Sequence, residues 1–338
     1  MNTIKKECNP SVKLRDVLLL TRPKPANEVQ AALWKKLIEG SLEVPETRET
    51  VLSEKGQSKA TWEGLIDSGM GYMAVLRNLK NMLENKISDA HLTKVLNKLR
   101  DPEQVRKSKQ LPFRFYAAYK MVQATGLSKA GEVLGAIEDA LAVSFENLPR
   151  LKGTTAIVVD ESGSMSTVLS ENSSVSYRDV GNLLAAAAGK FCEHAVTIPF
   201  GQTAKALTLS PRSSIFDNMA KMENSGVGHS TNLHEAFRVI DSLDTKVDRI
   251  LIFSDMQAYG DDIYSYANDD CQGWTNKYRT KVPQLWVHSV DLAGHGTTKV
   301  CGNKVNLITG WSDKVLNFIH VVEEGGADLI KTIEEYQI

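Results

Sequence analysis

The second half of the chain alternates strand-like and helix-like stretches, and this alternation constrains the fold most strongly. Apolar runs of strand character lie at 154–160, 195–201, 249–255 and 283–290. Stretches with helical spacing lie at 179–193, 213–222, 232–243 and 312–322. The run from Ala156 to Val159 is continuously apolar, as in a strand that is buried on both faces. Such alternation predicts a doubly wound α/β domain, residues 151–338, with a mostly parallel sheet.

Residues 1–150 show helical periodicity instead. The helical stretches lie around 14–20 and at 26–42, 60–83, 88–110, 112–126 and 129–149. Successive helices with short polar joints are typical of an α-solenoid, although no strict repeat period is visible. We therefore expect two domains, 1–150 and 151–338, and an overall fold class of α + α/β.

Oxygen-bearing side chains follow two of the predicted strands. Asp160, Ser162 and Ser164 occupy alternate positions after the first run, and Asp255 ends the third. Thr231 stands in a glycine-punctuated loop just before a helix. Ligands of doubly wound sheets bind beyond the carboxyl ends of the strands, where both aspartates are expected. Two carboxylates and three hydroxyls suit Mg²⁺ or Mn²⁺ rather than zinc.

An alternative interpretation of these residues needs no metal ion. Asp160 and the serines after it could form a turn that caps the next helix. Thr231 could likewise cap the helix that starts near Asn232, and Asp255 could be a turn aspartate. Each alternative is plausible alone, but three such loops at matching strand ends favour an ion site.

The charge of the chain is divided unevenly between its halves. The net charge is −1 overall, +6 for residues 1–150 and −7 for residues 151–338. A basic half joined to an acidic half suggests a polyanion partner for the first and a cation for the second.

Targeting signals and cysteine motifs are absent from the sequence. No apolar run approaches the roughly 20 residues that span a bilayer, and the N-terminus lacks the apolar core of a secretory signal. The four cysteines, Cys8, Cys192, Cys271 and Cys301, form no CxxC pair. Free thiols in the cytoplasm, with no membrane partner, are the simplest interpretation.

The segment DESGSM at 160–165 resembles the DxSxS signature of von Willebrand factor A domains. The resemblance implies a metal-ion-dependent adhesion site whose remaining ligands are a Thr and an Asp. Thr231 and Asp255 stand at the matching positions, in the right order. The implied ligand set is therefore Asp160, Ser162, Ser164, Thr231 and Asp255, with Glu161 directed away from the ion.

Three stretches of the first half resemble the TROVE module of Ro proteins, in the same order: VKLRDVLLLTRPKP, WEGLIDSGMGYMAVLRNLKNM and LPFRFYAAYKMV. A TROVE module followed by an A domain is the Ro architecture. The resemblance implies a HEAT-like helical arc, followed by a doubly wound, Rossmann-like A domain. It also implies binding of small non-coding Y-like RNAs or misfolded RNAs, as part of a ribonucleoprotein.

Basic side chains in the helical half are the expected phosphate contacts. A first group comprises Lys13, Arg15, Arg22 and Lys24. A second group comprises Lys94, Lys98, Arg106, Lys107, Lys109 and Arg114. Arg22 stands where Ro proteins often carry His, and it keeps the positive charge while adding a planar fork of donors.

The chain differs from Ro proteins in having little sequence before its first TROVE-like stretch. Its first helix carries Leu14, Val17, Leu18, Leu19 and Leu20, which would be partly uncovered there. Exposed apolar patches of this kind usually mark interfaces. We therefore expect self-association through residues 12–37, or pairing with a separate helical subunit.

The sequence thus predicts a non-catalytic RNA-binding protein with a Mg²⁺-binding A domain. An alternative is a metal-dependent protein-interaction module, in which a partner's carboxylate completes the coordination and no RNA is bound. A phosphoryl-transfer enzyme with Asp160 as nucleophile is less favoured, because the sequence offers no phosphate-binding loop.

Overall fold

A computed structural model describes residues 13–42, 47–110, 112–145, 150–171, 173–210, 212–257, 271–296, 298–312 and 314–325. The chain forms two compact units, Met1–Leu65 and Ile66–Ile338, each of which is treated by itself below. Within the described ranges, no helix combines the length and the apolar character that crossing a membrane requires.

The first unit is helical. Its helices are α1 (Leu14–Thr21), α2 (Glu28–Glu39), α3 (Arg48–Lys55) and most of α4 (Lys59–Asp67). Asn27 caps α2 by accepting a hydrogen bond from the Gln30 amide, and Gly40 ends this helix in the left-handed conformation. Leu18 is buried, whereas Leu14, Leu20 and Val29 are 65%, 80% and 80% exposed. The predicted self-association of this segment stays a prediction.

Five more helices begin the second unit: α5 (Tyr72–Glu84), α6 (Asp89–Arg100), α7 (Pro102–Ser108), α8 (Pro112–Gln123) and α9 (Ala130–Ser144). Two of the predicted helical stretches are each divided. The stretch at 60–83 breaks at Gly69, whose φ is +87°, and the stretch at 88–110 breaks at Asp101, which caps the helix that Pro102 starts. The α + α/β class is confirmed, while the HEAT-like arrangement and the boundary at 150/151 stay predictions.

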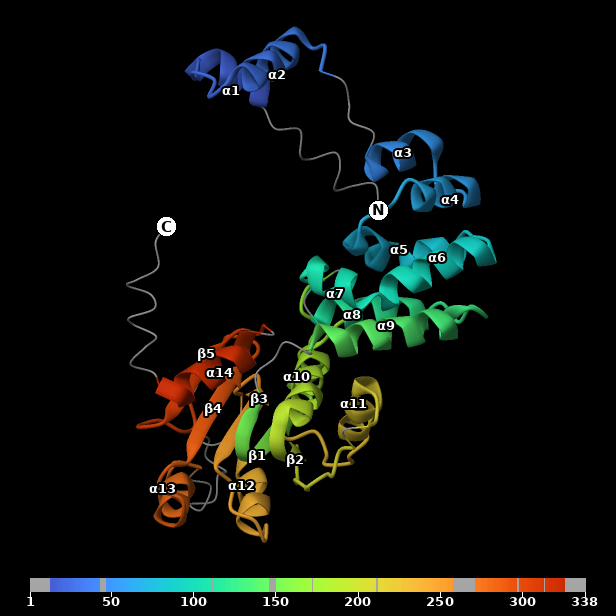
Figure 1. Ribbon diagram of the computed structural model, residues 1–338. Coiled ribbons are helices and arrows are strands. Elements are labelled where there is room, and N and C mark those ends of the chain that lie inside the picture. Colours follow the sequence, from blue (N-terminus) through green and yellow to red (C-terminus); the bar gives the residue numbers. More distant parts are fainter. Residues whose placement is uncertain are drawn as a thin grey trace. The chain divides into compact units, whose positions relative to one another are not determined.

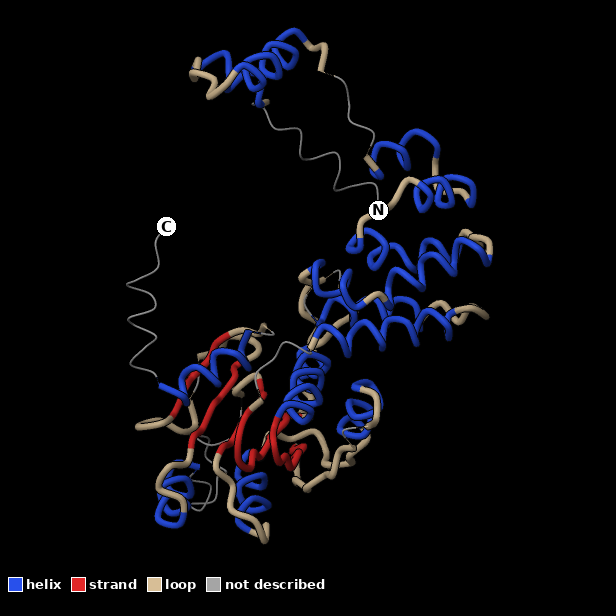
Figure 2. The backbone as a smooth tube through the Cα atoms, in the orientation of Figure 1, coloured by secondary structure: helices blue, strands red, loops and turns tan. Residues whose placement is uncertain are grey.

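A five-stranded parallel sheet follows in the same unit (Figure 2). Its strands are β1 (Leu151–Asp160), β2 (Cys192–Phe200), β3 (Arg249–Ser254), β4 (Trp286–Asp291) and β5 (Val305–Thr309). The order across the sheet is β2-β1-β3-β4-β5. Strand β2 lies on one side of β1 and β3 lies on the other, so the strand order reverses between β1 and β3. The carboxyl ends of β1 and β3 are therefore adjacent, at the position where doubly wound sheets bind ligands.

Helices cover both faces of this sheet (Figure 1). One face packs Ala156, Val158 and Ile252 against α12 (Leu233–Asp241) and α13 (Cys271–Lys281). The other face receives α10 (Tyr177–Phe191), since a Cβ on its Gly181 would lie 3.9 Å from the Phe253 Cβ. Burial on both faces explains the continuously apolar pattern of β1 and β3.

The sequence prediction missed two elements of the second unit. Strand β5 lies at the edge of the sheet and is only partly buried, so its run VNLIT gives a weak strand signal. Helix α13 is the second, since no helical stretch was predicted at 271–281, and it carries Trp274, Tyr278 and Arg279. There Trp274 stacks on Tyr278 with ring centroids 4.8 Å apart, and the Tyr278 hydroxyl accepts a hydrogen bond from the Val247 amide.

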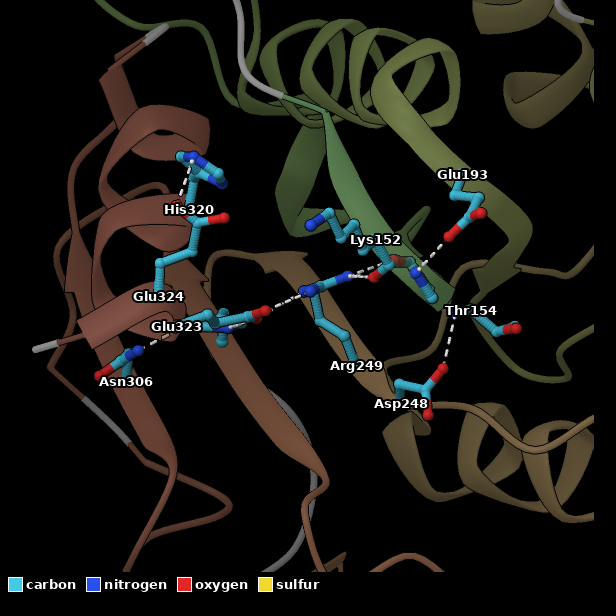
Figure 3. Close-up of polar contacts among 12 residues, drawn as sticks. Lys152, Thr154, Glu193, Asp248, Arg249, Asn306, His320, Glu323 and Glu324 are labelled. Atoms are coloured by element: carbon cyan, nitrogen blue, oxygen red, sulfur yellow. Dashed lines mark hydrogen bonds and ion pairs between the residues drawn. The ribbon is translucent and has the colours of Figure 1, made fainter.

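A buried ion pair lies at the amino end of β3 (Figure 3). Nε and Nη2 of Arg249 donate to the two carboxylate oxygens of Glu323 on α14 (Lys314–Gly325). His288 of β4 donates from Nε2 to Glu323 Oε1 across 2.8 Å, since its Nδ1 accepts from Asn306 across 2.9 Å. The Arg249 side chain also donates to the Thr155 hydroxyl at 2.9 Å. The cluster joins α14 to β1, β3, β4 and β5.

Candidate metal site at the carboxyl edge of the sheet

The segment 160–164, named the metal loop below, begins at the last residue of β1. The Asp160 side chain is fully buried and accepts a hydrogen bond from the Ser162 amide, 2.8 Å from its Oδ1. Its Oδ2 accepts from the Ser254 hydroxyl at 2.5 Å. The hydroxyl oxygens of Ser162 and Ser164 lie 3.1 Å apart. Three of the predicted ligands are thus gathered in one loop.

The loop that carries Thr231 is held against the metal loop by backbone contacts. The Gly163 amide donates to the His229 carbonyl at 2.9 Å, two residues before Thr231. The Asn232 amide donates to the Gly201 carbonyl at 2.9 Å, just beyond the end of β2. Thr231 is 5% exposed. The Thr231 loop therefore lies beside the metal loop, at the carboxyl edge of the sheet.

Asp255 completes the set from the end of β3. It is 2% exposed, and its Oδ1 accepts from the Gln257 amide at 3.1 Å. Burial raises the pKa of Asp160 from its ordinary 3.8 to about 6, although hydrogen bonds from Ser162 and Ser254 oppose the rise; the negative charge of Asp255 adds to it. Two buried carboxylates that repel each other are the arrangement that a cation would stabilise.

The donor chemistry of this site fits a hard divalent cation. Among the described residues, no three His, Cys, Asp or Glu side chains form a group that could hold a metal ion. The predicted site supplies only two carboxylates, and hydroxyl oxygens make up the rest. Such an all-oxygen set suits Mg²⁺ or Mn²⁺ and offers nothing to zinc.

Glu161, the residue between two predicted ligands, is directed to helix α10. Its carboxylate lies 3.2 Å from Nε of Arg178, and its side chain is 5% exposed. Burial raises the pKa of the Glu161 carboxyl to about 7, against the opposing effect of the Arg178 charge. Beside this pair lies a cavity of about 460 Å³, which Glu223, Ser225 and His229 also line. The cavity adjoins the metal loop.

A close backbone approach keeps the Thr231 loop in place. A Cβ built on Gly201 would lie 2.2 Å from the carbonyl oxygen of Gly228, a distance that no side chain tolerates. We expect Gly201→Ala to destabilise the protein by about 1–3 kcal/mol, as overpacking does, in urea denaturation. Gly189→Ala is the control, because a Cβ there meets only Ile157 Cδ1, at 3.9 Å. Equal stability of the two variants would contradict this interpretation.

The first group of predicted RNA contacts lies in the first unit. Lys13, Arg15, Arg22 and Lys24 are all exposed. Lys13 precedes α1 as its N-cap, and Arg22 ends that helix in the left-handed conformation with φ +43°. These four side chains therefore surround the two ends of one short helix.

The second group lies in the second unit, and part of its charge is neutralised. Lys94 pairs with Asp67 at 2.6 Å, and Lys107 pairs with Glu103 at 3.3 Å. Lys98 donates to the Met70 carbonyl. Arg106, Lys109 and Arg114 are exposed, and so are the paired Lys94 and Lys107. The pairing of Lys94 with Asp67 could not be predicted from the sequence pattern alone.

Two residues of the site were not predicted from the sequence. Ser254 bridges the two aspartate loops, because its hydroxyl donates to Asp160 and accepts from the Met256 amide at 2.9 Å. Its position directly before Asp255, at a strand end, was an available signal. Arg178 donates to the carbonyls of Glu161 and Ser162 at 3.2 and 2.8 Å. No local pattern marks that arginine.

Comparison with known proteins finds a family match within the helical part of the chain. Residues 30–133 match the family model of the TROVE domain. Telomerase protein component 1 is 44% identical in Mus musculus and 46% identical in Rattus norvegicus, each over 79 residues. Those matches cover 23% of this chain and 3% of each relative.

Two longer matches are more distant. The RNA-binding protein RO60 of Caenorhabditis elegans is 25% identical over 214 residues, covering 58% of this chain and 32% of that protein. The crystal structure of the Deinococcus radiodurans RO (RSR) protein superposes with a TM-score of 0.61 at 17% identity, covering 95% of this chain and 72% of the other. At that identity, the structural match supports the fold alone.

Proposed function

We propose that this chain is a Ro-like TROVE protein that binds RNA without catalysing a reaction on it. The TROVE match at 30–133 is the observation that carries the proposal, and a relative that matches 58% of the chain is named as an RNA-binding protein. The chain spans only about 3% to 32% of the lengths of these relatives, so its partners are proposed from its own residues.

The proposed ligand is a small structured or misfolded RNA, of the Y-like class that the family resemblance implies. The supporting feature is the net charge of +6 on residues 1–150, much of it exposed around α1 and on α7. Lysine and arginine contacts to phosphate position an RNA without reading its sequence. We propose a cytoplasmic ribonucleoprotein as the setting.

Charge reversal tests the RNA proposal. Replacing Lys13, Arg15, Arg22 and Lys24 together by Glu is expected to weaken binding of every RNA sequence alike, because phosphate contacts carry no base code. The slope of log affinity against log salt should become shallower, by roughly 0.7 for each lost contact to single-stranded RNA. Filter binding of a labelled RNA at several salt concentrations measures both quantities.

The paired lysines provide the control for that experiment. Replacing Lys107 by Glu changes a side chain that already pairs with Glu103, so a smaller loss of RNA affinity is expected. Unchanged RNA binding in the fourfold variant would exclude the first group as the contact surface. Absence of RNA binding by the unaltered protein would overturn the proposed function.

We further propose that the sheet unit is a von Willebrand factor A-like domain that holds Mg²⁺ or Mn²⁺. The residues that would hold the ion are Asp160, Ser162, Ser164, Thr231 and Asp255. The buried aspartates, the adjacent serine hydroxyls and the neighbouring Thr231 loop support this assignment. The ion would supply a positive charge that neutralises the two carboxylates.

A protein partner at the metal edge is a second candidate function. The cavity of about 460 Å³ beside the metal loop favours it, because a side chain next to a ligating carboxylate could enter there. Salt dependence distinguishes the two functions, since RNA binding falls steeply with salt and a protein-only module has no RNA affinity.

A further inference from the structure

The first turn of α10 carries two adjacent charged residues that contact different parts of the second unit. Arg178 is directed to the metal loop, as described above, and its side chain is 18% exposed. Its Nη2 donates to the carbonyls of Glu161 and Ser162, while Nε lies 3.2 Å from the Glu161 carboxylate. One guanidinium thereby fixes the backbone between two predicted metal ligands.

Asp179, the next residue, is directed to helix α8. Its carboxylate accepts from Lys120 Nζ at 2.9 Å and from the Tyr116 hydroxyl. It also accepts from the amide and the hydroxyl of Ser176, at 2.7 and 2.8 Å, which closes the capping box of α10. Burial opposes ionisation, but these hydrogen bonds outweigh it and hold the pKa of Asp179 below its usual value.

Two aromatic rings of α8 pack beside this contact, on Phe216 of α11 (Ile215–Glu223). Lys120 Nζ lies 5.7 Å above the centre of the Tyr116 ring, and the Tyr116 ring packs on Phe216 with centroids 5.7 Å apart. Tyr119 also packs on Phe216, at 4.0 Å. Helix α8 lies inside the TROVE match, so one helical turn contacts both the TROVE segment and the metal loop.

From these contacts we propose that Arg178 is a positioning residue for the metal loop, and that Asp179 links this loop energetically to α8. The proposal rests on the proposed metal site. Adjacent residues of one helical turn move together, so a change in the metal loop that displaces Arg178 also displaces Asp179. By thermodynamic reciprocity, any effect of the cation on the α8 contact appears equally as an effect of Tyr116 and Lys120 on cation affinity.

The test measures Mg²⁺ affinity of the full chain by isothermal titration calorimetry. Arg178→Lys is expected to weaken Mg²⁺ binding by about 10-fold or more, as changes in the groups that orient metal ligands usually do. Lys120→Met and Tyr116→Phe, which touch no predicted ligand, are each expected to weaken it by about 5-fold, the lower range of measured couplings. The double variant Arg178→Lys/Lys120→Met should deviate from additivity.

Lys281→Met is a closely matched control. Lys281 pairs with Asp241 at 2.8 Å and lies 5.9 Å above the Tyr278 ring, so it repeats the chemistry of Lys120. It stands at the end of α13, next to the amino end of the sheet. Its replacement should leave Mg²⁺ affinity unchanged.

Urea denaturation without Mg²⁺ separates positioning from general stability. A purely structural role for Lys120 and Tyr116 would lower the unfolding midpoint of their variants and leave the Mg²⁺ affinity of the folded protein unaltered. That result overturns the linkage while the metal site stands. If the unaltered protein binds no Mg²⁺, the proposed metal site fails, and the linkage fails with it.

Discussion

Glu323→Ala is expected to lower the free energy of unfolding of the second unit by about 3–5 kcal/mol, because it leaves a buried charge without its partner. Arg249 is 5% exposed, and Glu323 also accepts from His288, which is fully buried. Urea denaturation followed by circular dichroism measures the change. Few single substitutions elsewhere in the chain should cost as much.

Glu324→Ala is the matched control for that prediction. Glu324 is the next residue of α14, its side chain is 61% exposed, and it pairs with His320 one turn earlier at 3.2 Å (Figure 3). Exposed pairs contribute only about 0–1 kcal/mol, so this variant should resemble the unaltered protein. Similar losses of unfolding free energy in both variants would show that the buried pair stabilises the fold no more than the exposed pair does.

Acid should weaken the same cluster. Burial opposes ionisation of Glu323, but its bonds to Arg249 and His288 outweigh burial and hold its pKa below 4.5. The contribution of ionised Glu323 to the stability of the fold is therefore present above pH 4.5. It is lost as the pH falls through the lowered pKa. Burial lowers the pKa of His288 below 6.5, so its neutral form also stabilises the fold at neutral pH and protonation destabilises it. The difference in free energy of unfolding between Glu323→Ala and the unaltered protein should therefore become smaller below pH 4.5.

Asp160→Asn is expected to abolish stabilisation by Mg²⁺. If the unaltered protein binds Mg²⁺ as proposed, 100 times the dissociation constant should stabilise it by about 2.7 kcal/mol. The variant keeps the shape of the side chain and loses the negative charge, so its melting temperature should not respond to Mg²⁺. Differential scanning fluorimetry with and without the ion measures this.

The sign of the Asp160 shift adds a second expectation. Burial raises the pKa of Asp160 to about 6. The contribution of its carboxyl group to stability is therefore present below pH 3.8, the ordinary pKa, and is lost as the pH rises through 6. At pH 7.5 without Mg²⁺, Asp160→Asn should therefore be at least as stable as the unaltered protein. Ser164→Ala should weaken the response to Mg²⁺. Ser166→Ala, which changes an exposed residue two positions after the metal loop, should keep it. A full Mg²⁺ response in Asp160→Asn would exclude the site.

The pattern of apolar residues predicted those helices and strands whose burial follows the same pattern along their whole length. Strands β1 and β3 are buried on both faces and read as continuous apolar runs, so they were found. Strand β5 is half-exposed and was missed, because its alternation is short and resembles a loop. The division of the 60–83 stretch depended on Gly69, whose positive φ a periodic pattern cannot reveal.

The candidate site was predictable as far as its residues follow strands directly. Asp160 and Asp255 end adjacent strands, and the strand order brings them to one edge. The Arg178 and Asp179 contacts were not predictable, since they join segments up to 63 residues apart and no local rule ties them. The pairing of Lys94 with Asp67 could not be predicted from the sequence for the same reason.

The Arg249–Glu323 pair has a consequence for synthesis on the ribosome. The two residues are 74 positions apart, so the cation of β3 emerges long before the carboxylate that neutralises it. At elongation rates of about 5–20 residues per second, that interval lasts roughly 4–15 seconds. Until then, a sheet closed over Arg249 would enclose an uncompensated charge. The sheet should therefore reach its final packing only after α14 has been translated, and nascent chains arrested near residue 310 should remain sensitive to protease.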